Sequence, residues 1–169
     1  KAQKKGVHFA IATGRIYSDV EPFLQENGIE CECIVMNGAE YRDKGGNVLE
    51  SIHIDKNKAA EIFNMIEQNE ISSEIYTNKG LYTIDSKEKV LIQIAYRVQA
   101  FNPGVSFEEA LVLAKEHNHF TNLNYITDIN NFLNSDIKIG KFVTFYNDEE
   151  TTKKVKVKLK AIDGLAISS

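Results

Sequence analysis

A hydroxyl, a glycine and a cation stand together where a short apolar run ends near the start of the chain. The run 9–12 reads Phe-Ala-Ile-Ala and is followed by Thr13, Gly14 and Arg15. Such a run predicts a strand buried on both faces. Thr13 can donate its hydroxyl to an anionic oxygen, Gly14 lets the backbone approach a ligand, and Arg15 offers a planar set of N–H donors. The three residues suit phosphate. An ordinary strand-to-helix turn, with Thr13 as a cap and Arg15 in solvent, is the alternative.

A second apolar run ends in a similar way. Residues 34–36 read Ile-Val-Met and lead into Asn37, Gly38 and Ala39. Ligands of open α/β sheets bind just beyond the carboxyl ends of the strands. We therefore expect the two runs to be parallel, paired strands joined by a right-handed helical crossover, with Asn37 beside the Thr13 turn.

The order of these motifs resembles the haloacid dehalogenase-like (HAD) phosphohydrolases of the Cof type, in which a strand ending ATGR is followed by a helix and a strand ending NGA. The resemblance implies an α/β fold in which this chain supplies part of a Rossmannoid parallel sheet, two strands plus a hairpin, with an inserted α+β cap domain. It also implies that Thr13 binds the phosphoryl group of the substrate. Gly14, Arg15 and Asn37 match recurring positions around the same pocket.

Other motifs of that family are not found in the 169 residues: the N-terminal DxDGT-like motif, a later lysine, and the GDxxND-like acidic motif that binds magnesium. We therefore expect an internal segment of a longer enzyme, with no catalytic residue and no metal ligand of its own, inactive by itself. For the full-length protein, the resemblance implies a magnesium-dependent phosphatase that acts on a small phosphorylated metabolite through an aspartyl-phosphate intermediate.

Two other classes of function are considered. The first is a non-catalytic fragment or pseudo-enzyme that binds a small ligand or a protein partner. The second is half of a nucleotide-binding oxidoreductase, which is disfavoured because no G-x-G-x-x-G follows the first strand. Reading the gene on either side of the segment would separate the first class from the phosphatase.

Composition narrows the partners and the location. A hydrophobic share of 43% with 26% charged residues is typical of a folded domain, and we expect it in the cytoplasm. The net charge of −4 argues against nucleic acid as a partner. No apolar run is long enough to cross a membrane. The basic stretch 153–160 fits the solvated face of a helix better than a membrane-binding segment. Metal or disulfide roles are not expected for Cys31 and Cys33.

The boundary between core and cap is predicted just before a capped helix. Residues 40–54 carry a hairpin signal around Lys44-Gly45-Gly46-Asn47. Asp55 can then cap a helix over 56–68 whose apolar residues share one face. We accordingly assign residues 1–54 to part of the HAD-like core and residues 55–169 to the cap.

The periodicity of the remaining residues predicts the other elements. These are helices over 17–27, 88–101, from 106 and over 149–162, a hairpin over 73–85, a loop with a helical turn over 118–134, and strands over 137–146 and 165–169.

Three local signals refine these elements. Capping boxes are predicted at Ser18 with Glu21 and at Ser106 with Glu109, and Asp128 is a candidate cap for a short helix. His117 and His119 fit the end of a helix better than a metal site. Four tyrosines either line a substrate-facing surface or are simply half-buried strand residues: Tyr76, Tyr82, Tyr96 and Tyr125.

Overall fold

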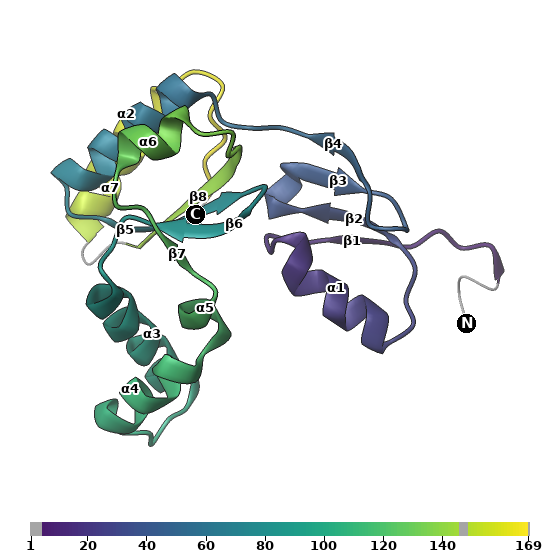
Figure 1. The fold of residues 1–169 in the computed structure, drawn as a ribbon, viewed down its shortest axis with the longest axis horizontal. Coiled ribbons are helices and arrows are strands. Elements are labelled where there is room, and N and C mark those ends of the chain that lie inside the picture. The colour runs from purple at the N-terminus through teal and green to yellow at the C-terminus, as the bar shows by residue number, and fades with distance from the viewer. Residues whose placement is uncertain (1–4, 146–148, 169) are drawn as a thin grey trace.

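The chain folds around two four-stranded sheets. The computed structural model describes residues 5–145 and 149–168. The first sheet has the strand order β1-β2-β3-β4, and the second has the order β7-β6-β5-β8. Figure 1 shows the two sheets next to each other, joined by the connection from β4 to α2. This mixed α/β architecture agrees with the predicted fold class.

The first sheet confirms the predicted pairing of the two motif-bearing strands. β1 is parallel to β2, with Ala10 opposite Glu32 and Ala12 opposite Ile34. The helix α1 connects them and lies on one face of the sheet (Figure 1). The predicted hairpin follows, because β3 pairs antiparallel with β2 and with β4. The bounds are β1 Ala10–Ala12, α1 Tyr17–Glu26, β2 Glu32–Val35, β3 Glu40–Arg42 and β4 Val48–Ser51.

The prediction that the first strand is buried on both faces is wrong for this chain. Ala10 and Ala12 are exposed and Ile11 is half-buried. Just before the strand, Val7 and Phe9 are 54% and 47% exposed. β1 lies at the end of its sheet and pairs only with β2 among the described strands. Its apolar residues therefore have a helix on one face and solvent along the outer edge.

The capping box predicted at Ser18 and Glu21 is also wrong. α1 begins at Tyr17, its N-cap is Ile16, and no side chain caps it, so Thr13 is not the cap either. The Tyr17 ring stacks under the guanidinium of Arg42, 4.3 Å from the ring centroid. With this contact at Tyr17, α1 begins one residue before Ser18, and Ser18 lies inside the first turn of the helix.

A small cluster holds α1 on the sheet. Val20 and Leu24 of the helix pack against three buried residues of the β2 segment: Cys31, Cys33 and Val35. Both cysteines are free thiols. Burial, followed by the neighbouring Cys31, raises the pKa of the Cys33 thiol to about 11.

The second sheet is built around β5. β6 and β8 pair antiparallel with β5, and β7 adds a short parallel strand to β6. The hairpin predicted over 73–85 and the strand predicted over 137–146 are thereby found, while β7 and α5 are elements of the segment predicted as loop. The strand bounds are β5 Ser72–Thr77, β6 Gly80–Thr83, β7 Asn124–Tyr125 and β8 Ile139–Phe145.

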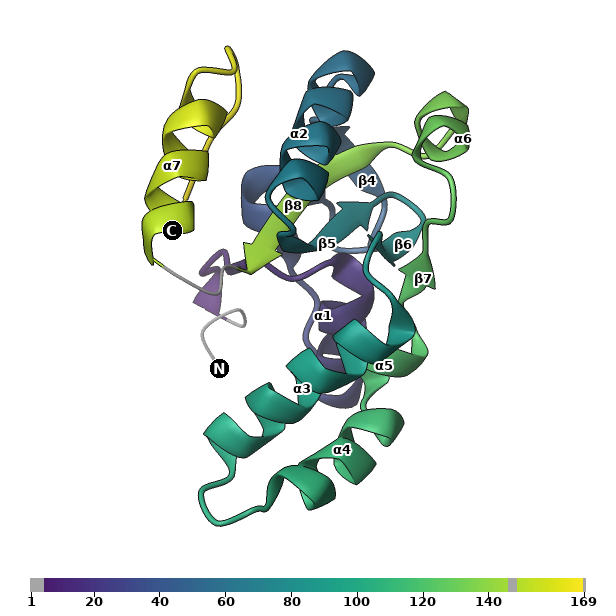
Figure 2. The same cartoon turned by 90° about the vertical axis from the view of Figure 1, so that its left-hand side faces the viewer.

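Helices cover the second sheet from two sides. On one side, α2, α6 and α7 pack through Phe63, Phe132 and Val155 onto Ile75 and other residues of the sheet. On the other side, α3 and α4 form a hairpin that projects away from the sheet, with α5 between them and β7 (Figures 1 and 2). The helix bounds are α2 Lys56–Gln68, α3 Lys87–Phe101, α4 Phe107–Glu116, α5 Asn118–Thr121, α6 Ile129–Asn134 and α7 Glu149–Lys160.

Three predicted caps of this region are confirmed. Asp55 accepts hydrogen bonds from the backbone N–H groups of Asn57 (2.9 Å) and Lys58 (3.4 Å). Ser106 and Glu109 form a complete capping box at α4. The Asp128 carboxylate accepts from the N–H of Asn131 at 2.9 Å, which starts α6.

The last predicted strand is not formed. Residues 165–168 have no regular structure, and Ser169 lies outside the described residues, as does Tyr146 at the end of the strand predicted over 137–146. Ile162 and Leu165 instead pack against the cluster between α2 and α7. Their apolar character serves helix packing rather than a sheet. Within residues 5–145 and 149–168, no helix is long and apolar enough to cross a membrane.

Candidate functional site

The two motif-bearing turns are tied together by backbone hydrogen bonds. The N–H of Thr13 donates to the carbonyl of Ile34 at 2.9 Å, which extends the pairing of β1 with β2. The N–H of Asn37 then donates to the carbonyl of Thr13 at 3.2 Å, and that of Met36 to the carbonyl of Arg15 at 2.9 Å. The backbones of residues 13–15 and 36–37 therefore form one unit, which we call the double turn.

The double turn has an uncommon backbone conformation. Met36 and Asn37 have φ values of +52° and +59°. Asn adopts this left-handed region more readily than other residues with a Cβ, whereas for Met it is uncommon and unfavourable by about 1–2 kcal/mol. Met36 is held there by burial, with 5% of its surface exposed. Conformations of this kind concentrate at functional sites.

Gly14 is required by the close approach of Asn37. A Cβ added at Gly14 would lie 2.8 Å from the Asn37 Oδ1 atom, closer than non-bonded atoms approach. Any side chain at position 14 would therefore displace the Asn37 amide. The glycine therefore serves contact between the two turns.

The Thr13 hydroxyl is oriented by its own turn. The N–H of Arg15 donates to the Thr13 Oγ at 3.3 Å. Because the oxygen accepts this bond, its own hydrogen is left to donate to an anion. Thr13 is half-buried, and Arg15 and Asn37 are exposed. The structure thus brings together all four residues predicted at the site: Thr13, Gly14, Arg15 and Asn37.

A lysine that the sequence did not single out also reaches the double turn. Lys141 lies on β8 of the second sheet, and its Nζ donates to the Gly14 carbonyl at 2.6 Å and to the Asn37 Oδ1 at 2.9 Å. Burial lowers the pKa of Lys141, with Glu74 opposing that shift. These partners are more than 100 positions apart, and one lysine in an alternating strand carries no local signal of the contact.

The Lys141 side chain is supported by its cross-strand neighbour. Tyr76 lies opposite Lys141 in the register of β5 and β8, and the ammonium is 4.1 Å from the centroid of the Tyr76 ring. The Tyr76 hydroxyl donates to Glu74 at 3.3 Å. Burial, reinforced by Glu74, raises the pKa of Tyr76 to about 12, so the phenol stays protonated.

Glu74 is the centre of a buried polar cluster behind that tyrosine. Its carboxylate pairs with Arg97 at 3.1 Å and with His119 at 2.8 Å. Burial raises the pKa of Glu74, but the hydrogen bonds and charges of His119 and Arg97 outweigh it, and the net pKa is lowered. His117 is the C-cap of α4, as predicted for the end of a helix, and His119, in the short helix α5, pairs with Glu74 of β5.

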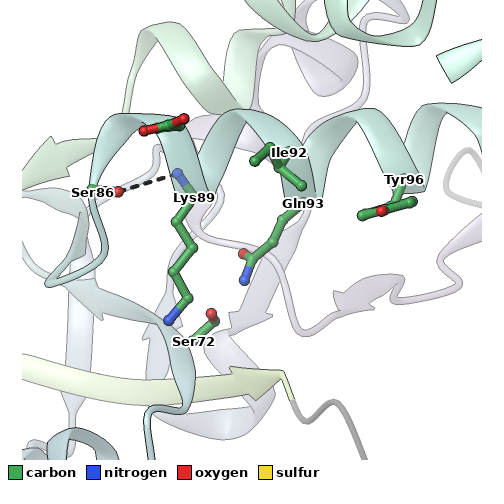
Figure 3. A pocket seen from close by; sticks show the side chains of 7 residues that line it. Ser72, Ser86, Lys89, Ile92, Gln93 and Tyr96 are labelled. Carbon is green, nitrogen blue, oxygen red and sulfur yellow. Dashed lines mark hydrogen bonds between the residues drawn. The ribbon is translucent and has the colours of Figure 1, made fainter. Parts of the chain in front are cut away.

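Two pockets in the described part of the chain differ in whether they include residues of the double turn. One, of about 330 Å³, adjoins the double turn between the start of α1 and the β5–β6 turn, and its lining includes Ile16, Ser18, Met36, Arg42 and Asn78. The other, of about 360 Å³, lies over α3 and β5 and includes none of the double turn. Figure 3 shows its lining, with the Lys89 side chain extending toward Ser72. Of the four tyrosines considered, Tyr96 lines this second pocket.

The donor set of the double turn fits an anion. Its residues carry a hydroxyl, an amide and a guanidinium, from Thr13, Asn37 and Arg15, and the Lys141 ammonium contacts it. Magnesium prefers carboxylate oxygens. Within the described part of the chain, no three His, Cys, Asp or Glu side chains are grouped closely enough to hold a metal ion. These residues therefore do not fit the magnesium implied by the resemblance.

In open α/β sheets, ligands bind beyond the carboxyl ends of the strands, and the double turn stands at such ends of β1 and β2. The sequence profile of the haloacid dehalogenase-like hydrolases matches residues 1–168, and the chain belongs to that family. The predicted family and fold are thereby confirmed.

Individual proteins similar to this chain are consistent with its membership of this family. Phosphatase YwpJ of Bacillus subtilis (strain 168) is 26% identical over 147 residues, which are 87% of this chain and 50% of that protein. The chain thus spans about half the length of this curated relative. Among solved structures, a haloacid dehalogenase-like hydrolase from B. subtilis superposes with a TM-score of 0.78 at 23% identity, covering 99% of this chain and 60% of the other. The HAD subclass IIB sugar phosphatase BT4131 gives a TM-score of 0.55 at 24% identity, covering 91% and 50%.

Proposed function

We propose that this chain is the substrate-binding part of a phosphatase that hydrolyses a small phosphorylated metabolite. The observation that carries the proposal is the double turn, in which a threonine hydroxyl, an asparagine amide and a cation converge at the ends of two parallel strands. Thr13 would hold a phosphoryl oxygen, with Gly14, Arg15 and Asn37 completing the cradle. In the complete protein, residues 1–54 would form part of the core and residues 55–169 the cap.

The chemistry needs groups beyond these. By resemblance, the nucleophilic aspartate that forms the aspartyl-phosphate, and the carboxylates for magnesium, would lie in sequence outside this chain. Magnesium would supply charge neutralisation at the transferred phosphoryl group. The residues of this chain would bind and orient the phosphate and shield it from water. We propose a cytoplasmic location for the enzyme.

The neighbouring pocket suits the leaving group. We call the first sheet with α1 the first unit, and the second sheet with its helices the second unit. Both units line the pocket, with Ser18 and Arg42 from the first and Asn78 and Lys79 from the second. Hydroxyl, amide and charged side chains can hydrogen-bond to a polar metabolite. A sugar phosphate fits this lining, in keeping with the sugar phosphatase among the structural relatives.

The test uses the full-length protein with Thr13→Val, which keeps the shape of the side chain and removes the hydroxyl. We expect a loss of about ten- to a thousandfold in kcat/KM on a panel of sugar phosphates, the scale of one lost donor. Thr144→Val, at a strand threonine of β8, is the matched control and should retain wild-type kinetics.

Two results would contradict the proposal. Wild-type kinetics for Thr13→Val would remove the role of the hydroxyl. A full-length protein that hydrolyses no phosphate ester in the presence of magnesium would favour the non-catalytic alternative. The 169-residue chain alone should be inactive with or without magnesium. Turnover of a phosphate ester that survives repurification would contradict the expectation that the chain is a segment without catalytic residues of its own.

A further inference from the structure

The contact between Lys141 and Asn37 fixes which end of the Asn37 amide faces a ligand. The lysine ammonium has only donors, so the amide atom that faces it at 2.9 Å must be the acceptor Oδ1. That same Oδ1 lies against Gly14. With the oxygen held on this side, the Nδ2 group and its two hydrogens are left to donate in another direction.

The lysine is itself held in place from behind and from the side. It lies over the Tyr76 ring, whose hydroxyl is anchored to Glu74. Gly140, the preceding residue, lets β8 approach the double turn, since a Cβ there would come within 3.2 Å of the Met36 Sδ. The second sheet therefore places the Lys141 ammonium against both turns of the double turn, at Gly14 and at Asn37.

We propose that Lys141 is a positioning residue, which acts from the second sheet by orienting the Asn37 amide so that its N–H₂ group faces the substrate phosphate. The inference rests on the proposed function, because it takes the double turn as the phosphate site. According to this proposal, the two units share one site. The first sheet supplies the Asn37 N–H₂ donor, and Lys141 of the second sheet orients it.

The first test needs no catalytic activity. In ¹⁵N–¹H spectra of the 169-residue chain, the Asn37 side-chain amide signals can be identified by their loss in Asn37→Asp. Lys141→Met keeps the stem and removes the ammonium, so it should shift or broaden these signals. Lys87→Met is the control, because Lys87 also lies over a tyrosine ring, that of Tyr125, at 5.5 Å. Unchanged Asn37 signals in Lys141→Met would overturn the proposal.

The second test is kinetic and uses the full-length enzyme. Lys141→Met should raise KM about tenfold and change kcat much less, since orienting a phosphate donor affects ground-state and transition-state binding alike. Asn37→Gly, which suits the positive φ, should have an effect at least as large. If Lys141 acts through Asn37, the double variant should be no worse than Asn37→Gly alone.

The two tests separate the possible failures. Fully additive losses in the double variant would show that Lys141 acts independently of Asn37 and would overturn the proposal. An inactive wild-type enzyme would overturn the proposed function, while the amide spectra would still decide whether Lys141 orients Asn37. Should Lys141→Met fail to fold, Lys141→Arg replaces it, because the different fork geometry should also move the Asn37 signals.

Discussion

The two sheets of this chain differ in how far their own helices cover them. The second sheet has helices on both sides and three buried clusters around it. Among the described residues, the first sheet has one α-helix and one small cluster, and Val7, Phe9 and Ile34 stay exposed. The difference teaches that the second unit carries a core of several clusters, whereas the core of the first unit, which holds the double turn, is small.

The largest expected effect comes from separating the two units. Residues 55–169 expressed alone should unfold cooperatively on heating, because this length buries a sizeable core. Residues 1–54 alone should show no cooperative transition. Calorimetry or circular dichroism would check both. A featureless melt or aggregation of the 55–169 segment would contradict the statement that the second unit carries its own core.

Phenylalanine substitutions test the same difference within the intact chain. Phe63 is 1% exposed and meets the rings of Phe132 and Phe142 edge-on. Phe63→Ala should lower the free energy of unfolding by about 3–5 kcal/mol. Phe9→Ala, at a residue 47% exposed, should change it by less than about 0.5 kcal/mol. Urea unfolding measures the free energy of unfolding of both variants. Equal losses would contradict the difference in burial between the two phenylalanines.

Acid should act on the second unit through Glu74. Its pKa in the folded chain lies below the usual 4.5, so its contribution is complete above that pH and is lost as the pH falls through the lowered value. Glu74→Gln should reduce stability at pH 7 by about 1–3 kcal/mol, and the difference from wild type should shrink in acid. Glu61→Gln, at an exposed position of α2, is the control. A difference that does not depend on pH would contradict the role of the carboxylate.

The smallest expected effect concerns the helix starts. Ser106→Ala removes a formed capping box and should cost about 1 kcal/mol. Ser18→Ala removes no cap, because α1 starts without one, and should be within about 0.5 kcal/mol of wild type. Thermal unfolding of the two variants side by side would show whether the caps of the two units differ as described.

These helix starts also show what the sequence could and could not predict. The caps at Asp55, Ser106 and Asp128 depend on residues within one turn, and all three were predicted correctly. The start of α1 involves Arg42, which stacks on Tyr17 from a later strand, and the local signal at Ser18 was misleading. The strand predicted at 165–169 failed for a similar reason, since its Leu165 packs against the cluster between α2 and α7.

The residues of the candidate site also fall into two groups, those that the local sequence predicted and one that it did not. Thr13, Gly14, Arg15 and Asn37 follow the ends of predicted parallel strands, so strand periodicity and motif spacing were enough to predict that they meet. The contact of Lys141 with Gly14 and Asn37 depends on how the second sheet sits against the first. No local pattern encodes that placement, and it became visible only in the three-dimensional structure.

The two thiols beneath α1 allow local opening of the first unit to be followed by the rate of their chemical modification. Cys31 and Cys33 are 2% and 0% exposed, and the Cys33 pKa of about 11 leaves little thiolate at neutral pH. We therefore expect alkylation of these thiols to require opening of the cluster that they form with Val20 and Leu24 of α1. The rate of their modification reports the opening of this one cluster, independently of the larger core in the second unit. It also leaves the folded surface free for a single engineered cysteine that carries a spectroscopic label.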